Sequence, residues 1–66
     1  MTPLYAARIA VLEGRTTYEI ETCKAQARIA LYLGDLDRAI YNTRVALYIA
    51  RLIRVGATPA NGWAGS

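Results

Sequence analysis

Arginine and tyrosine side chains follow one another at helical spacing in the second half of the chain. Tyr41, Arg44, Tyr48 and Arg51 stand at i, i+3, i+7 and i+10, so a helix would carry them as one continuous stripe. Tyrosine and arginine are enriched where protein interfaces gain most of their binding energy. The spacing therefore predicts a partner-binding surface. Its predicted members, with two residues of the preceding helical stretch, are Tyr41, Arg44, Tyr48, Arg51, Arg28 and Tyr32.

Two other interpretations of this stripe stay open. Arginines interleaved with aromatic rings could bind single-stranded nucleic acid, through phosphate pairing and base stacking. Tyrosines also commonly lie at the edge of a core with the ring buried and the hydroxyl in water, while arginines line a solvated face. The net charge is +3, and residues 38–66 hold four arginines and no acidic residue. This basic half is compatible with all three interpretations.

The chain lacks the residues on which most catalytic and metal sites are built. Histidine, the commonest general base and a frequent zinc ligand, is absent. Cys23 is the single cysteine, and we expect it to be packed in the core. The pairs Glu19/Glu21 and Asp35/Asp37 are two residues apart, a spacing that points side chains apart on a helix. No glycine-rich phosphate loop occurs. We predict that the protein is not an enzyme and holds no cofactor or metal.

Three positions carry the signals with which helices begin. Thr2 is followed by Pro3, which favours a cap and then the first helical residue. Thr16 and Glu19 have the spacing of a capping box. Asp35 follows a glycine and is a third candidate cap. The predicted helices therefore span about residues 3–13, 17–33 and 36–55.

Glycines mark the ends of the three predicted helices. Gly14, Gly34 and Gly56 each follow a helical stretch, where a left-handed residue closes the last turn. The connections are so short that neighbouring helices must run roughly antiparallel. We therefore expect an all-α chain with a long helical hairpin, one helical domain at residues 1–56 and a flexible tail at 57–66.

The third predicted helix carries two apolar faces rather than one. A helix on the surface of a small monomer normally shows a single apolar stripe. We assign the alanine-rich face to the hairpin interior because alanine allows close approach, and leave the tyrosine-bearing face for the first helix, a second copy or a partner. The alanine-rich face comprises Leu36, Ala39, Ile40, Thr43, Ala46, Leu47 and Ala50. The other face comprises Tyr41, Val45, Tyr48, Ile49 and Leu52.

Small residues and a glycine–aspartate turn follow a known arrangement. Gly34 and Asp35 form the turn, Ala39 follows five residues after the glycine, and Ile40 lies beside it. The other positions of the pattern are Ala27, Ala30, Ala46 and Leu47. Over residues 23–50 the chain resembles a single tetratricopeptide-type helical hairpin. The resemblance implies a protein-binding module, completed by oligomerisation because such repeats need about three units for stability.

The chain departs from that family's pattern at three points. Cys23 and Thr43 stand where the family favours an aromatic residue. No proline follows the second helix of the hairpin at the usual distance. The resemblance is therefore carried by the turn and the small residues around it.

Size and hydrophobicity complete the functional prediction. The chain has 66 residues, of which 55% are hydrophobic, more apolar surface than so small a core absorbs. We therefore predict a self-associating protein–protein interaction module, acting as adaptor, regulator or inhibitor. A basic nucleic-acid-binding protein and a structural subunit of a larger assembly are the alternatives. We see no signal peptide or membrane span and expect a cytoplasmic location without a membrane or small-molecule partner.

Overall fold

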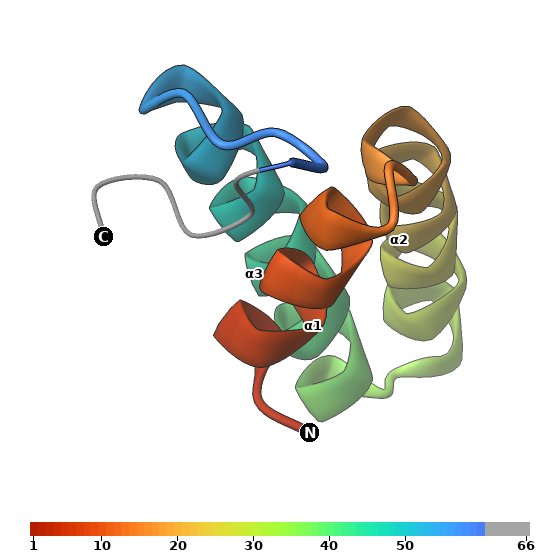
Figure 1. The fold of residues 1–66 in the computed structure, drawn as a ribbon. Coiled ribbons are helices and arrows are strands. Elements are labelled where there is room, and N and C mark those ends of the chain that lie inside the picture. Colours follow the sequence, from red (N-terminus) through yellow and green to blue (C-terminus); the bar gives the residue numbers. More distant parts are fainter. Residues whose placement is uncertain (61–66) are drawn as a thin grey trace.

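The computed structural model describes residues 1–60 and contains three helices (Figure 1). They are α1 (Pro3–Leu12), α2 (Thr16–Leu33) and α3 (Leu36–Arg54), and no strand forms among the described residues. The predicted all-α fold with a long α2–α3 hairpin is confirmed, and the predicted helix bounds differ from the observed ones by at most one residue. The predicted tail lies partly outside the described residues, at 61–66.

Two of the three predicted helix starts are confirmed by their hydrogen bonds. The Thr2 hydroxyl oxygen accepts a bond from the backbone N–H of Tyr5 at 3.2 Å. The Asp35 carboxylate accepts one from the backbone N–H of Arg38, also at 3.2 Å. Each side chain satisfies a backbone donor that the first turn of a helix leaves without a partner.

The capping box predicted for α2 is wrong. Helix α2 begins at Thr16 itself, Arg15 occupies the cap position, and no side chain caps the helix. The backbone N–H of Arg15 is already bonded to Ala10 in the closing turn of α1, at 2.9 Å, so α2 starts directly after that turn. Glu19 does not reach back to the backbone because it pairs with the Arg15 guanidinium instead.

The turn between α2 and α3 is closed by Gly34. Its φ is 76°, in the left-handed region that glycine adopts without strain. The N–H groups of Gly34 and Asp35 donate to the carbonyl oxygens of Leu31 and Ala30, at 3.1 and 2.8 Å. This is the pairing that closes a helix with a left-handed residue. The hairpin therefore turns within two residues.

The core lies where α1 packs against the second half of α3. Ile49 and Val11 are the largest fully buried side chains, and Ala7 and Ala10 let α1 approach closely. Short α1 lies across α3 beside α2, as Figure 1 shows. The buried residues of this cluster are Ala7, Ala10, Val11, Cys23, Val45, Ile49 and Ala57. The residues partly buried against it are Ala6, Ile20, Tyr41, Ala46, Tyr48 and Leu52.

The assignment of the alanine-rich face of α3 to the hairpin interior is largely wrong. Ala39 is buried and Ala46 half-buried, but Leu36, Ile40 and Leu47 are exposed, as are Thr43 and Ala50. Helix α1 instead covers the face with Val45 and Ile49, on its own chain. Ala7 and Ala10 of α1 allow the close approach at which Val45 and Ile49 become buried, which favours that face. The uncovered face of α3 is thus the opposite of the one expected.

The segment after α3 turns back and packs on the core cluster through Ala57. Ala57 is buried in the core cluster, and its N–H donates to the Leu52 carbonyl at 2.9 Å. Pro59 lies near Gly14. A Cβ atom placed on Gly14 would be 3.6 Å from Cγ of the Pro59 ring. Figure 1 shows this segment, in blue, approaching the end of α1. Ala57 and Pro59 therefore pack on the helical domain, although they belong to the predicted tail.

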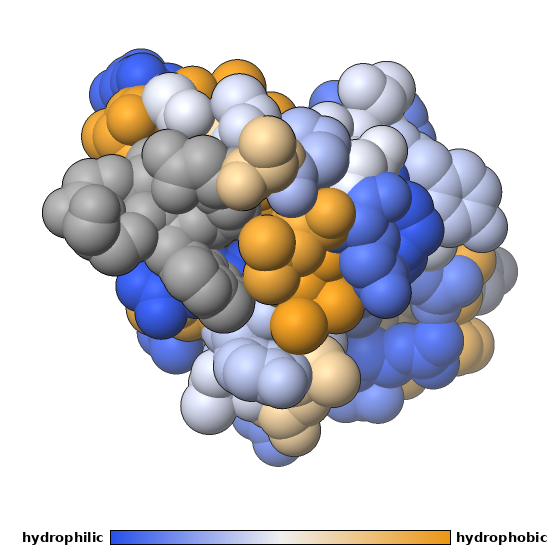
Figure 2. All heavy atoms as spheres, viewed as in Figure 1, coloured by the Kyte–Doolittle hydropathy of each residue, from blue (hydrophilic) through white to orange (hydrophobic). Residues whose placement is uncertain are grey.

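The surface over α1 is itself partly apolar. Figure 2 shows an apolar group over α1, beside hydrophilic side chains toward α2. Leu4 and Tyr5 are the exposed large hydrophobic residues of α1. The covering helix thus leaves apolar side chains of its own in solvent.

Replacing Gly34 tests the turn. Gly34→Val should lower the free energy of unfolding by about 1–2 kcal/mol, because a Cβ opposes the left-handed conformation. No atom lies within 4 Å of an added Cβ, so the cost arises from the backbone alone. Gly34→Asn should lose much less, because asparagine tolerates positive φ. Urea melts of the two variants measure the difference, and a valine variant as stable as the wild type would contradict the turn geometry.

A pair of isoleucines on α3 tests which face is buried. Ile49 is 0% and Ile53 46% exposed, so truncation should affect them unequally. Ile49→Ala should cost about 2–5 kcal/mol, enough to unfold much of so small a domain. Ile53→Ala should change stability by less than about 0.5 kcal/mol. Circular dichroism melts measure the stability of both variants. Equal losses of stability would contradict the rotation of α3 that buries Ile49 and exposes Ile53.

Candidate partner-binding surface

The structure divides the six predicted partner-binding residues into two groups. Tyr41 and Tyr48 are partly buried against the core cluster. The others are exposed, and the Tyr32 ring is 91% exposed near the end of α2. The exposed group comprises Arg28, Tyr32, Arg44 and Arg51. The predicted stripe is therefore not one surface, since its tyrosines pack on the core while its arginines face solvent.

The tyrosine nearest the basic end of α3 has contacts on two sides. The Arg51 guanidinium carbon lies 5.9 Å from the centre of the Tyr48 ring, within the range of a cation–π contact. The same ring packs on the core cluster. Tyr48 therefore positions Arg51 at the edge of the exposed face of α3.

The exposed face of α3 carries a row of side chains, all of which except Arg54 were predicted to lie inside the hairpin. The side chains recur at alternating intervals of four and three residues, the spacing of a coiled-coil seam. Three of them are large and apolar, with exposures of 61% for Leu36, 49% for Ile40 and 45% for Leu47. We call these residues the outer row: Leu36, Ile40, Thr43, Leu47, Ala50 and Arg54.

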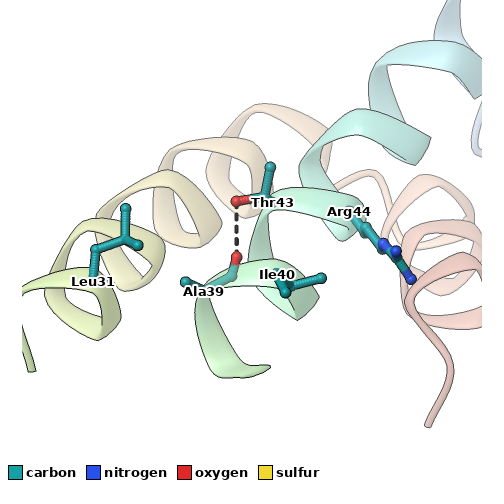
Figure 3. Close-up of a pocket in the computed structure, with 5 residues that line it drawn as sticks. All are labelled: Leu31, Ala39, Ile40, Thr43 and Arg44. Carbon is teal, nitrogen blue, oxygen red and sulfur yellow. Dashed lines mark hydrogen bonds between the residues drawn. The ribbon is translucent and has the colours of Figure 1, made fainter. Parts of the chain in front are cut away.

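The first hollow on this face lies between α3 and the end of α2. It has a volume of about 260 Å³, and Leu31 of α2 forms one wall while Ile40 and Arg44 of α3 form the other (Figure 3). The floor carries Thr43 and Ala39, whose hydroxyl and carbonyl are joined by a 2.8 Å hydrogen bond. Because the Thr43 proton is used in that bond, the hollow offers mostly apolar walls.

A second hollow follows one heptad further along α3. It has a volume of about 240 Å³ and is lined by Leu47, Ala50, Arg51 and Arg54. Shifting Ile40, Thr43 and Arg44 by seven residues gives Leu47, Ala50 and Arg51, so the two hollows share three lining positions one heptad apart. The intervals of four and three residues are visible in the sequence. They were missed as a binding surface because this face of α3 was predicted to be buried in the hairpin.

The exposed face of α3 is positively charged, and its arginines form no ion pair with the described residues. Arg44, Arg51 and Arg54 form no ion pair within residues 1–60, and no acidic residue follows Asp37. The ion pairs that do form lie near α2, such as the one between Arg15 and Glu13. The arginine charges of the outer face are therefore available to an external group.

Nothing in the described part of the chain gathers into a site for a metal ion, because no three His, Cys, Asp or Glu residues cluster there. Cys23 is 4% exposed in the core. Burial raises the pKa of its thiol above the ordinary value, and the Glu19 carboxylate adds to the rise. The thiol is therefore a core side chain of low reactivity.

Comparison of the chain with protein-family models, with curated proteins and with solved structures gives no match. No helix within residues 1–60 is long and apolar enough to cross a membrane. Functional inference for this chain therefore depends on the surface itself.

Alkylation tests the state of Cys23. Because the thiolate is the reactive form, the buried thiol should react with iodoacetamide at pH 7 at least about tenfold more slowly in the folded protein than in denaturant. The rate in the folded protein should rise with pH, since the raised thiol pKa keeps the thiolate scarce at neutral pH. Mass spectrometry follows the adduct. Equal rates in both states would show that Cys23 is accessible.

Proposed function

We propose that this chain is a non-catalytic helical protein–protein interaction module that binds its partner through the outer row of α3. The observation that carries the proposal is the exposure of Leu36, Ile40 and Leu47 at coiled-coil spacing. Large side chains exposed in a contiguous row mark interaction surfaces more often than singly exposed ones do.

The outer row is held in place before any partner arrives. The opposite side of α3 is fixed by Val45 and Ile49 in the core, and Arg38 at its start is hydrogen-bonded to Gln26 of α2. Helix α3 therefore does not need to fold on binding. A surface already ordered loses less conformational entropy on association, which favours affinity.

The resemblance to a tetratricopeptide-type hairpin supports the same function. Such hairpins belong to protein-binding arrays, and the short turn at Gly34 with buried Ala30 and Ala39 is compatible with close hairpin packing. Adaptor, regulator and inhibitor roles all require a binding surface of this kind. The outer row supplies a candidate for it.

Nucleic-acid binding is the second candidate, and one observation favours it. Arg44, Arg51 and Arg54 lie on the same exposed face without ion-pair partners in the described residues. The partial burial of Tyr41 and Tyr48 against the core leaves less ring surface for base stacking, however. Apolar side chains between the arginines suit a protein partner better.

Site-specific photocrosslinking in the cells that produce the chain tests the function. A benzophenone amino acid in place of Leu36, 61% exposed and outside both hollows, should give a discrete protein adduct. The same group in place of Tyr18, 69% exposed on α2, should give none. Adducts are separated by gel electrophoresis and identified by mass spectrometry.

Two controls decide the outcome of that experiment. Leu47→Asp in the crosslinking background should abolish the adduct while the far-ultraviolet circular dichroism stays unchanged, because Leu47 is half exposed. An adduct removed by nuclease would favour the second candidate function. Absence of any adduct from position 36, or equal adducts from positions 36 and 18, would contradict the proposed function.

A further inference from the structure

We propose that the partner of the outer row is an acidic amphipathic helix of another protein, which inserts two apolar side chains seven residues apart into the two hollows. This inference rests on the proposed function and specifies its partner. It follows from the construction of the hollows, their spacing and the charge around them.

The hollows have the shape of coiled-coil acceptor sites. In a coiled coil each apolar knob enters a hole made by four residues of the facing helix. Residues at i, i+3, i+4 and i+7 are neighbours on a helix surface, and Leu47, Ala50, Arg51 and Arg54 have this spacing around the second hollow. One surface of a single helix thus already forms a complete hole.

The first hollow repeats three of these four positions, and Leu31 and Ala39 complete its lining in place of the fourth. Ile40, Thr43 and Arg44 occupy the corresponding positions, and Leu31 of α2 closes the side (Figure 3). A shift of seven residues along a helix amounts to about 10.5 Å, at 1.5 Å per residue. A partner helix that lies along α3 would place side chains seven residues apart in both hollows.

The charge around the hollows selects an acidic partner. Arg44 lines the first hollow and Arg51 the second, so the two guanidinium groups are also one heptad apart. Neither has an ion-pair partner among residues 1–60. Residues that flank a coiled-coil seam set partner choice through interhelical salt bridges. Carboxylates seven residues apart on the partner would pair with both arginines.

A second copy of this chain fits the face less well. Each copy would bring Arg44, Arg51 and Arg54, against Asp35 and Asp37, which lie together at the start of its α3. Most arginines of a two-fold pair would therefore face other arginines or neutral residues, and like charges brought together across an interface oppose association. The self-association expected from the sequence becomes an outcome that the experiment measures.

A pair of designed peptides tests the inference with the intact protein. Both are three-heptad helices with leucine at the seam positions, and they differ only in having glutamate or lysine at the flanking positions. At low ionic strength the glutamate peptide should bind with a dissociation constant at least about tenfold lower than the lysine peptide. Its glutamates attract Arg44 and Arg51, whereas the lysines of the other peptide repel them. Isothermal titration calorimetry measures both affinities.

Charge reversal on the protein provides the matched variants. The double variant Arg44→Glu/Arg51→Glu should reverse the preference and bind the lysine peptide more tightly. Lys24→Glu, which changes an exposed lysine of α2 that lines neither hollow, should leave the preference unchanged. Arg44→Gln/Arg51→Gln should abolish the preference, and it removes charge without adding acidic groups that could disturb folding.

The possible failures are distinguishable. If both peptides bind equally, or if Lys24→Glu changes the preference as much as the double variant, the acidic partner is wrong while a binding role for the row stands. If neither peptide binds and position 36 gives no crosslink, the proposed function fails as well. Sedimentation of the protein alone gives the remaining outcome, because a dimer dissociated by Leu47→Asp would assign the row to a second copy and overturn the inference.

Discussion

The packing of α1 on α3 is the contact on which the rest of this structure depends. Helix α1 spans only Pro3–Leu12, yet it buries Val11 completely against a core that contains Val45 and Ile49. Its alanines let the two backbones approach closely, so a short helix can cover the larger apolar side chains of α3. The core cluster of residues 1–60 includes this contact, so the contact fixes the rotation of α3 about its axis.

Once that rotation is fixed, the opposite side of α3 must face solvent. Helix α2 packs beside α3 and buries Ala30 and Ala39, but it does not extend over the outer row. The row therefore presents apolar side chains at coiled-coil spacing on a helix that its neighbours already hold in place. Arginines along its edge carry charge that the described residues leave without carboxylate partners. Apolar hollows beside unpaired positive charge are the features an acidic amphipathic helix would complement.

The same contact explains why the predicted arginine–tyrosine stripe separates. Tyr41 and Tyr48 belong to the flank of α3 that turns toward α1, whereas Arg44 and Arg51 extend to the solvent side. Neighbouring positions on a helix surface can thus serve different roles when the edge of a core passes between them. Arg44 and Arg51 line the two hollows, and the Tyr48 ring contacts the Arg51 guanidinium.

The sequence by itself determined the three helices, their short turns and two of their caps, because proline, glycine and capping residues act through local backbone geometry. The all-α class and the α2–α3 hairpin followed from these signals. Only the tertiary structure decided which face of α3 is buried, since both faces are apolar and periodicity ranks them equally. It also decided that Ala57 joins the core. These two choices depend on contacts between segments distant in sequence, which no local pattern contains.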